Sequence, residues 1–206
     1  MKRAILASTL GAAASLAIVS QTQAQGNVFF ANYANGAQLQ APVTYSGSPF
    51  NGLSNGEAVG TGPAGANFTA RLLYSYGANL GVTYTDAGVT ASFLAPNGDT
   101  ANGAGLFGFQ ANTVTIPGYS SGTVDFIVQV FNGADYASSN IKGQSGVVSL
   151  STLATAANSL PTGSLLSDNT AVITPLTAFT VSVPEPTTFA LAGLGAAAFL
   201  AIRRKK

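Results

Sequence analysis

Hydrophobic and polar residues alternate with a period of two in two segments of the chain, residues 68–76 and 124–131. Successive side chains of a β-strand point to opposite sides, so this period predicts strands with one face in the core. The expected core positions are Phe68, Ala70, Leu72, Tyr74, Tyr76, Val124, Phe126, Val128 and Val130. Asp125 falls between two of these positions, and we expect it to face solvent.

Turn signals separate further strand-like runs. Asn-Gly pairs, which favour the positive φ values of hairpin turns, recur at 35–36, 51–52, 55–56, 97–98, 102–103 and 132–133. The runs expected to form strands are 27–33, 40–45, 80–85, 89–94, 106–109, 112–116, 145–149 and 178–183. Residues 134–140 and 153–159 are compatible with short helices, and 150–176 is typical of a loop. Many short strands with Gly-rich turns predict an all-β body, a β-sandwich of jelly-roll or immunoglobulin-like type.

The first 24 residues have the three parts of a secretory signal peptide. Lys2 and Arg3 form a positive start, residues 4–19 are apolar, and Thr-Gln-Ala at 22–24 places small residues before a cut between Ala24 and Gln25. The apolar stretch is short and rich in Ala and Gly, so we expect a cleaved signal. An uncleaved N-terminal anchor is the alternative.

The C-terminal end mirrors this arrangement. Pro184, Glu185 and Pro186 precede an uncharged run at 189–202, and the chain ends on the basic tail Arg203, Arg204, Lys205 and Lys206. As a helix at ~1.5 Å per residue the run would span about 21 Å, short against a hydrocarbon core of ~30 Å. We therefore expect a transmembrane helix over 187–202 that holds the precursor transiently in the inner membrane, with the basic tail in the cytoplasm. A permanent single-span anchor is the alternative.

The ordered combination of Pro-Glu-Pro, one short span and a basic end resembles the PEP-CTERM sorting signal of Gram-negative bacteria. The resemblance implies recognition by an exosortase, an integral-membrane protease, and removal of the tail near Pro184-Glu185-Pro186. It also implies delivery of the body to the cell surface, outer envelope or medium, and an association with exopolysaccharide. The expected parts are a signal peptide (1–24), a Gly/Asn-rich body (25–181) and a sorting signal (182–206).

Composition removes several classes of function. The chain has no His and no Cys, which excludes a Ser-His-Asp triad, a thiol nucleophile, a zinc knuckle, an iron–sulfur cluster and a disulfide framework. Between residues 25 and 183 two basic side chains face six acidic ones, a net charge of −4. Phosphate contacts need clustered Lys and Arg, so we expect no nucleic-acid partner.

Several apparent motifs lack the context that their chemistry needs. Residues 60–65 and 103–108 match G-x-G-x-x-G, but neither lies between a strand and the start of a helix, as a dinucleotide site requires. Asn97, Asp99 and Asn102 lack the spacing of a calcium loop and are expected to bond turn backbone instead. We therefore expect no metal and no cofactor.

Two side-chain classes leave other functions open. Paired carboxylates can hydrolyse glycosides, and the body offers Glu57, Asp86, Asp99, Asp125, Asp135 and Asp168. Tyrosines can stack on sugars where several share an exposed face, and otherwise fill a core; they are Tyr33, Tyr45, Tyr74, Tyr76, Tyr84, Tyr119 and Tyr136.

We expect a non-catalytic exported protein of the cell surface or extracellular matrix, handled by the export machinery and an exosortase-type protease. One alternative is a carbohydrate-binding β-sandwich. The other is a glycoside hydrolase that uses two carboxylates.

Overall fold

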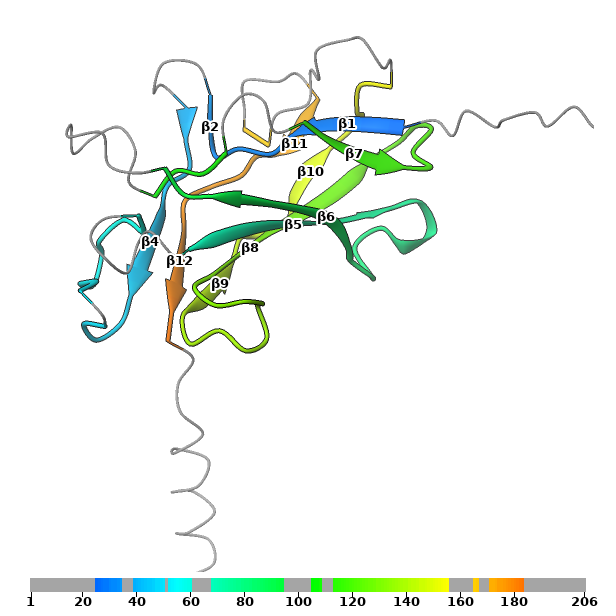
Figure 1. The fold of residues 1–206 in the computed structure, drawn as a ribbon. Coiled ribbons are helices and arrows are strands. Elements are labelled where there is room, and N and C mark those ends of the chain that lie inside the picture. Colours follow the sequence, from blue (N-terminus) through cyan, green and yellow to red (C-terminus); the bar gives the residue numbers. More distant parts are fainter. Residues whose placement is uncertain are drawn as a thin grey trace, which may run out of the picture.

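A computed structural model describes residues 25–34, 39–50, 52–60, 68–94, 105–108, 113–155, 165–166 and 171–183. Regular structure in these residues is almost all β-strand, with one 3₁₀ turn at Gly77–Asn79, labelled η1 (Figure 1). The all-β prediction is therefore confirmed, while its finer form, a jelly-roll or immunoglobulin-like sandwich, stays a prediction.

The strands are β1 (Gln25–Phe29), β2 (Tyr33–Ala34), β3 (Leu39–Gln40), β4 (Val43–Ser46), β5 (Thr69–Tyr76), β6 (Thr85–Ser92), β7 (Thr113–Pro117), β8 (Val124–Phe131), β9 (Lys142–Gln144), β10 (Val148–Leu150), β11 (Val172–Thr174) and β12 (Phe179–Ser182).

Strand β8 is the centre of an eight-stranded sheet. On one side it pairs antiparallel with β5 along its whole length, from Tyr76 opposite Val124 to Thr69 opposite Phe131. Its other side is shared: β10 pairs with residues 124–126 and β9 with residues 129–131. Beyond β9 lie β12 and then β4, whereas β6 flanks β5 and β11 flanks β10, so the sheet is forked (Figure 1).

A second, two-stranded sheet of β1 and β7 covers one part of this core (Figure 1). Its strands alternate strictly, and Val28, Val114 and Ile116 are buried in the same hydrophobic cluster as the large sheet. Gly26 is needed here because a Cβ would come within 2.6 Å of the Tyr119 ring and of Leu153 Cδ1.

The period-two pattern identified the core face of β8 correctly. Every predicted inward position of that strand is fully buried. In β5 the pattern holds up to Leu72 and then changes, since Tyr74 and Tyr76 are half-buried and Ser75 is buried. The Ser75 hydroxyl bonds Asn79 O and accepts the Gly81 N–H, which draws this polar side chain inward.

Two expected strands are wrong. Of the strand expected at 80–85, residues 80–82 form a turn and only Thr85 belongs to a strand, β6. The turn follows from Gly77 and Gly81, whose φ values of 63° and 70° only glycine reaches easily. In place of a strand at 106–109, the described residues 106–108 make one isolated bridge, Phe107 with Phe93.

The expected helix at 134–140 is also wrong. Asp135 accepts hydrogen bonds from the Ser138 N–H and hydroxyl, both at 2.8 Å, and Ser139 Oγ donates to Asp135 O at 2.6 Å. Side chains that bond the local backbone in this way compete with helix formation. Only 153–155 of the second expected helix are described, and they are not helical.

Candidate functional site

The predicted processing residues lie mostly outside the described residues. Gln25 is the first residue of β1, exposed and opposite Pro117. The other predicted residues are not described: Ala24, Pro184, Glu185, Pro186, Arg203, Arg204, Lys205, Lys206 and the expected transmembrane helix 187–202. Among the residues that the structure does describe, no helix is long and apolar enough to cross a membrane.

The segment directly before residue 184 includes β12, an interior strand of the large sheet. β12 pairs parallel with β4, from Phe179 opposite Val43 to Ser182 opposite Ser46, and contacts β9 on its other side. Val181 is fully buried. Among the described residues only Val183 follows the end of β12 at Ser182, so the described body ends in its own sheet.

Beside this segment lies a hollow of about 590 Å³. Ser182 and Val183 form one part of its lining, and residues 45–50, the end of β4 and the following turn, form the rest. Tyr45 is buried and donates its hydroxyl to Ser48 O at 2.6 Å, which holds the turn in place. The hollow therefore borders the last described residues of the chain.

Residues 182–205 match the PEP-CTERM protein-sorting motif. The chain carries a PEP-CTERM sorting motif. The match begins at Ser182, the last residue of β12, and includes Pro184-Glu185-Pro186 and most of the basic tail. The PEP-CTERM motif marks an exported protein that an exosortase processes. No characterised protein and no solved structure matches the chain.

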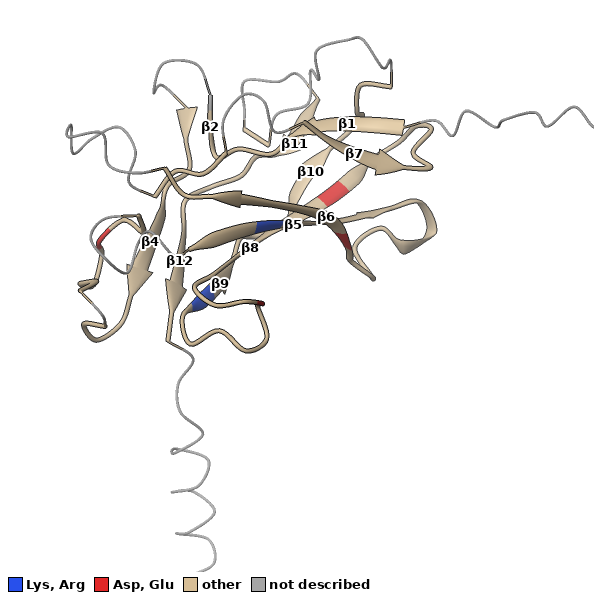
Figure 2. Ribbon diagram, viewed as in Figure 1, with Lys and Arg blue, Asp and Glu red and all other residues tan. Residues whose placement is uncertain are grey.

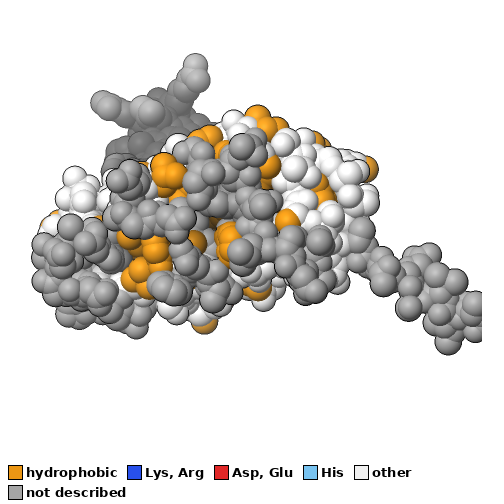
Figure 3. Space-filling view, turned by 90° about the horizontal axis from the view of Figure 1, so that it is seen from above, with side chains coloured by type: hydrophobic (Ala, Val, Ile, Leu, Met, Phe, Trp, Pro, Cys, Tyr) orange, Lys and Arg blue, Asp and Glu red, His pale blue; other side chains and the backbone are white. Residues whose placement is uncertain are grey.

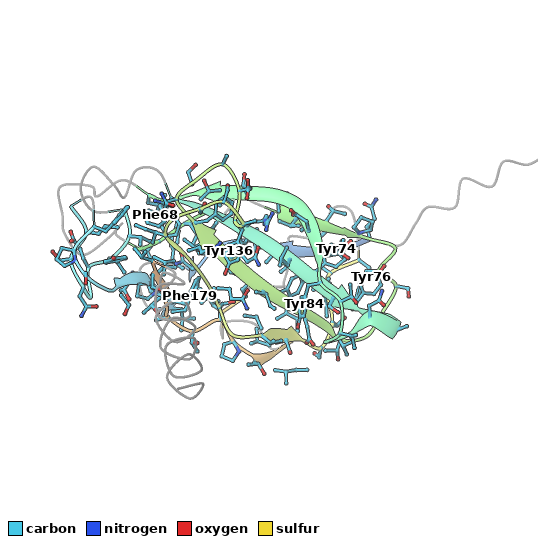
Figure 4. The ribbon with its side chains drawn as sticks, turned by 90° about the horizontal axis from the view of Figure 1, so that it is seen from below. Phe68, Tyr74, Tyr76, Tyr84, Tyr136 and Phe179 are labelled. Carbon is cyan, nitrogen blue, oxygen red and sulfur yellow. The ribbon has the colours of Figure 1, made fainter. Side chains whose placement is uncertain are left out.

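The body also has a pocket beside two tyrosines of β5, Tyr74 and Tyr76. Tyr74 and Tyr76 stack with ring centroids 6.0 Å apart and planes 22° apart. The pocket has a volume of about 340 Å³, and η1 and the following turn form its other walls. Figure 4 shows Tyr74, Tyr76 and Tyr84 at one end of the molecule, around the β5–β6 connection.

Two contacts hold the Tyr76 ring of this pocket in place. Tyr76 donates its hydroxyl to Pro117 O at 2.8 Å and meets the buried Tyr119 ring edge to face, with centroids 6.2 Å apart. Burial raises the pKa of Tyr74, and the neighbouring Tyr76 raises it further.

The remaining tyrosines are placed differently. Tyr45 and Tyr119 are core residues. Tyr136 lies in the β8–β9 loop against Phe131, with Lys142 Nζ 5.4 Å from its ring centroid. Burial raises the pKa of Tyr84, and the negative charge of Asp125 raises it further.

The described carboxylates each bond a different partner. Asp86 pairs with Arg71 at 3.3 Å, and Asp125, which is half-buried rather than fully solvent-facing, accepts the Ser149 hydroxyl at 2.6 Å. Glu57 Oε2 accepts the Ser54 N–H at 2.8 Å. The Ser138 N–H and then its hydroxyl lower the pKa of Asp135 below its ordinary value of 3.8. Asp99 and Asp168 lie outside the described residues.

The described residues contain no group of three potential metal ligands. Asn97 and Asn102 of the considered calcium loop are not described. In the glycine-rich matches, Gly105 and Gly108 serve packing: a Cβ on Gly105 would lie 2.8 Å from Val43 O, and one on Gly108 would overlap Phe30 O.

Charge is sparse over the described surface. Figure 2 shows its acidic and basic residues on separate elements, without a basic cluster among the described residues. The described side chains that are visible from above are nearly all hydrophobic or uncharged polar (Figure 3).

Sequence reasoning missed the polar side of the tyrosine pocket, which Asn79, Thr83 and Thr85 supply. The predicted core face of Tyr74 and Tyr76 is confirmed in part, since both rings pack against the core cluster while remaining half-buried. The available signal was the Gly-Ala-Asn-Leu-Gly turn at 77–81, directly after two tyrosines of the same strand face.

Proposed function

We propose that this protein is a non-catalytic, exported component of the cell surface or extracellular matrix, released from a transient membrane-bound precursor by an exosortase. The match at residues 182–205 is the observation that carries the proposal. It supports export and exosortase processing directly, while the location and non-catalytic role of the mature body are inferred here.

The sorting route follows from the order of the segments. Lys2 and Arg3 keep the start of the signal peptide inside, and the body crosses before the cut between Ala24 and Gln25. The apolar run 187–202 then halts transfer, with the basic tail retained by the positive-inside rule. Pro184 and Pro186 disfavour helix at and before their own positions, which supports an extended segment that a protease can grip.

The end of the sheet at Ser182 supports release of an intact body. All the strands described lie within residues 25–182, so a cut in or after Pro184-Glu185-Pro186 removes none of them. The buried Val181 anchors the final strand upstream of the cut.

Replacing Pro184-Glu185-Pro186 with Ala-Ala-Ala tests the proposal. We expect the full-length variant to accumulate in the inner membrane of the host, since the protease loses its recognition element. Fractionation with an antibody against the body measures this. Pro117→Ala, at an exposed proline that ends β7 and does not line the hollow beside Val183, is the matched control and should be released as the wild type is. Normal release of the triple variant would contradict the proposal.

The non-catalytic role is supported by the missing His and Cys and by the local bonding of each described carboxylate. The glycoside hydrolase alternative is tested by single substitutions of Glu57, Asp86, Asp99, Asp125, Asp135 and Asp168. A glycan-hydrolysing activity that disappears with one of them would establish the alternative.

An association of the mature body with extracellular polysaccharide is the second candidate function. Its support is the tyrosine pocket together with the sparse charge of the described surface, because few ions then need to be desolvated when the surface packs against neutral glycans. Retention of the released body by matrix polysaccharide from the host, compared with medium alone, tests this association.

A further inference from the structure

We propose that the pocket formed by Tyr74, Tyr76 and the β5–β6 turn is a binding subsite for a neutral sugar chain. The inference rests on the proposed polysaccharide association and assigns it a site and a ligand chemistry. The pocket volume of about 340 Å³ lies at the small end of ligand sites, roughly 300–1,000 Å³, and suits one small ring system.

The apolar part of the site is pre-organised. Tyr74 and Tyr76 present stacked rings, and the Tyr76 ring is held by its hydrogen bond to Pro117 O and its contact with Tyr119. Rigid aromatic side chains give large contact area at a low cost in side-chain entropy. The C–H face of a pyranose ring is the ligand surface that matches such a tyrosine wall.

Another part of the lining is polar and uncharged, and within it Thr85 pairs with Tyr74 across the β5–β6 ladder. It contains the exposed side chains of Asn79, Thr83 and Thr85, which form no hydrogen bond within the described part of the chain. An amide and two hydroxyls both donate and accept hydrogen bonds, as sugar hydroxyls do. The Ser75 hydroxyl, bonded to Asn79 O and Gly81 N, fixes the turn that carries Asn79.

Other ligand classes fit these groups less well. The residues that line the pocket carry no charge, so an anion or a metal ion finds no counter-charge there. Proline-rich peptides also dock on aromatic side chains, but their prolines lack N–H donors and would leave much of the polar wall unused. A ligand that offers both an apolar face and many hydroxyls uses both walls.

The position of the pocket keeps it accessible. It lies at the end of the sheet where β5 turns into β6, whereas β12 leaves the sheet elsewhere (Figure 1). In Figure 4, Phe179 of β12 is well separated from the three labelled tyrosines of this end. The site can therefore engage a polysaccharide both before and after the tail is cut.

Affinity electrophoresis of the full chain in mild detergent tests the site, with dextran, mannan and galactan as neutral probes and polygalacturonate and poly-L-proline as comparisons. We expect at least one neutral polysaccharide to retard the wild type. Tyr74→Ala, which removes a ring face, and the double variant Thr83→Val, Thr85→Val, which keeps shape but removes hydroxyls, should each weaken binding about tenfold. Tyr136→Ala, at a tyrosine outside the pocket, should bind as the wild type does.

The double Thr variant controls for loss of the fold, because Thr83→Val and Thr85→Val change only exposed side chains. Retardation by a neutral polysaccharide that all pocket variants retain would overturn the site but leave the association standing. No retardation by any neutral probe, or pocket-dependent binding of poly-L-proline alone, would overturn the sugar proposal. Exosortase processing is unaffected by either result, since its test is release of the Pro184-Glu185-Pro186 variant.

Discussion

At the scale of single residues, one buried asparagine joins three separate parts of the body. Asn32 is fully buried, and its Nδ2 donates to Ala41 O at 2.9 Å and to Gly105 O at 2.8 Å. Its Oδ1 accepts the Phe107 N–H at 2.7 Å. A polar side chain that satisfies three buried backbone groups fixes how their segments meet, because each group would otherwise lose its water without compensation.

Asn32→Ala should therefore lower the free energy of unfolding by about 3 kcal/mol, as measured by urea denaturation. The matched control is Asn27→Ala, which removes a single, solvent-exposed bond from Thr115 Oγ1 at 3.0 Å and should cost less than about 1 kcal/mol. Equal losses in the two variants would show that the Asn32 network does not organise these segments.

A pair of nearby glycines provides a second comparison. A Cβ on Gly143 would overlap Thr180 O and lie 2.9 Å from Val181 Cα, whereas one on Gly146 meets nothing within 4 Å. Gly143→Ala should push β12 away from β9 and cost about 2 kcal/mol or more. Gly146→Ala should leave thermal stability unchanged or slightly raised. Similar melting temperatures for both variants would contradict the close packing of β9 against β12.

At the scale of elements, the alternation of hydrophobic and polar residues predicted the strands whose buried face follows that alternation. It failed for elements whose conformation depends on the strands or side chains that they contact. The long strand β8 was predictable because its Val and Phe residues alternate over its whole length. Strand β9, Lys-Gly-Gln, has no such pattern and exists because β8 and β12 pair with it. The helix expected at 134–140 failed because Asp135 and Ser139 bond the local backbone.

The tyrosine pocket was predictable only in part. The spacing of Tyr74 and Tyr76 put both rings on one strand face, but whether that face is core or surface depends on what covers it. The turn residues Asn79 and Thr83 reach the pocket because the chain reverses at Gly77 and Gly81. The spacing of hydrophobic residues does not indicate this reversal.

Strand β12 marks the element boundary that matters for sorting. A chain that ends at Val183 keeps β12 between β9 and β4, so its thermal unfolding should match that of the body released by the host. A chain that ends at Ala178 loses β12 and the buried Val181, and we expect it to lose cooperative unfolding. Circular dichroism melts of the two truncations measure the difference. Retained cooperativity in the shorter chain would show that β12 is dispensable.

At the scale of the whole molecule, charge and hydrophobicity are divided between a weakly charged body and strongly marked ends. Six of the eight basic residues lie in the first three or last four positions. The last described strand of the body ends at Ser182, two residues before Pro184. This division suits a protein whose two ends direct its transport and whose body functions after both ends have been removed.

Intact mass with terminal peptide mapping, on protein recovered from the host envelope and medium, tests this account most directly. We predict a species that starts at Gln25 and ends within residues 183–186, and any surplus mass would reveal a group attached during sorting. A species that still ends at Lys206 and stays in the inner membrane would contradict release by an exosortase and establish a permanently anchored protein.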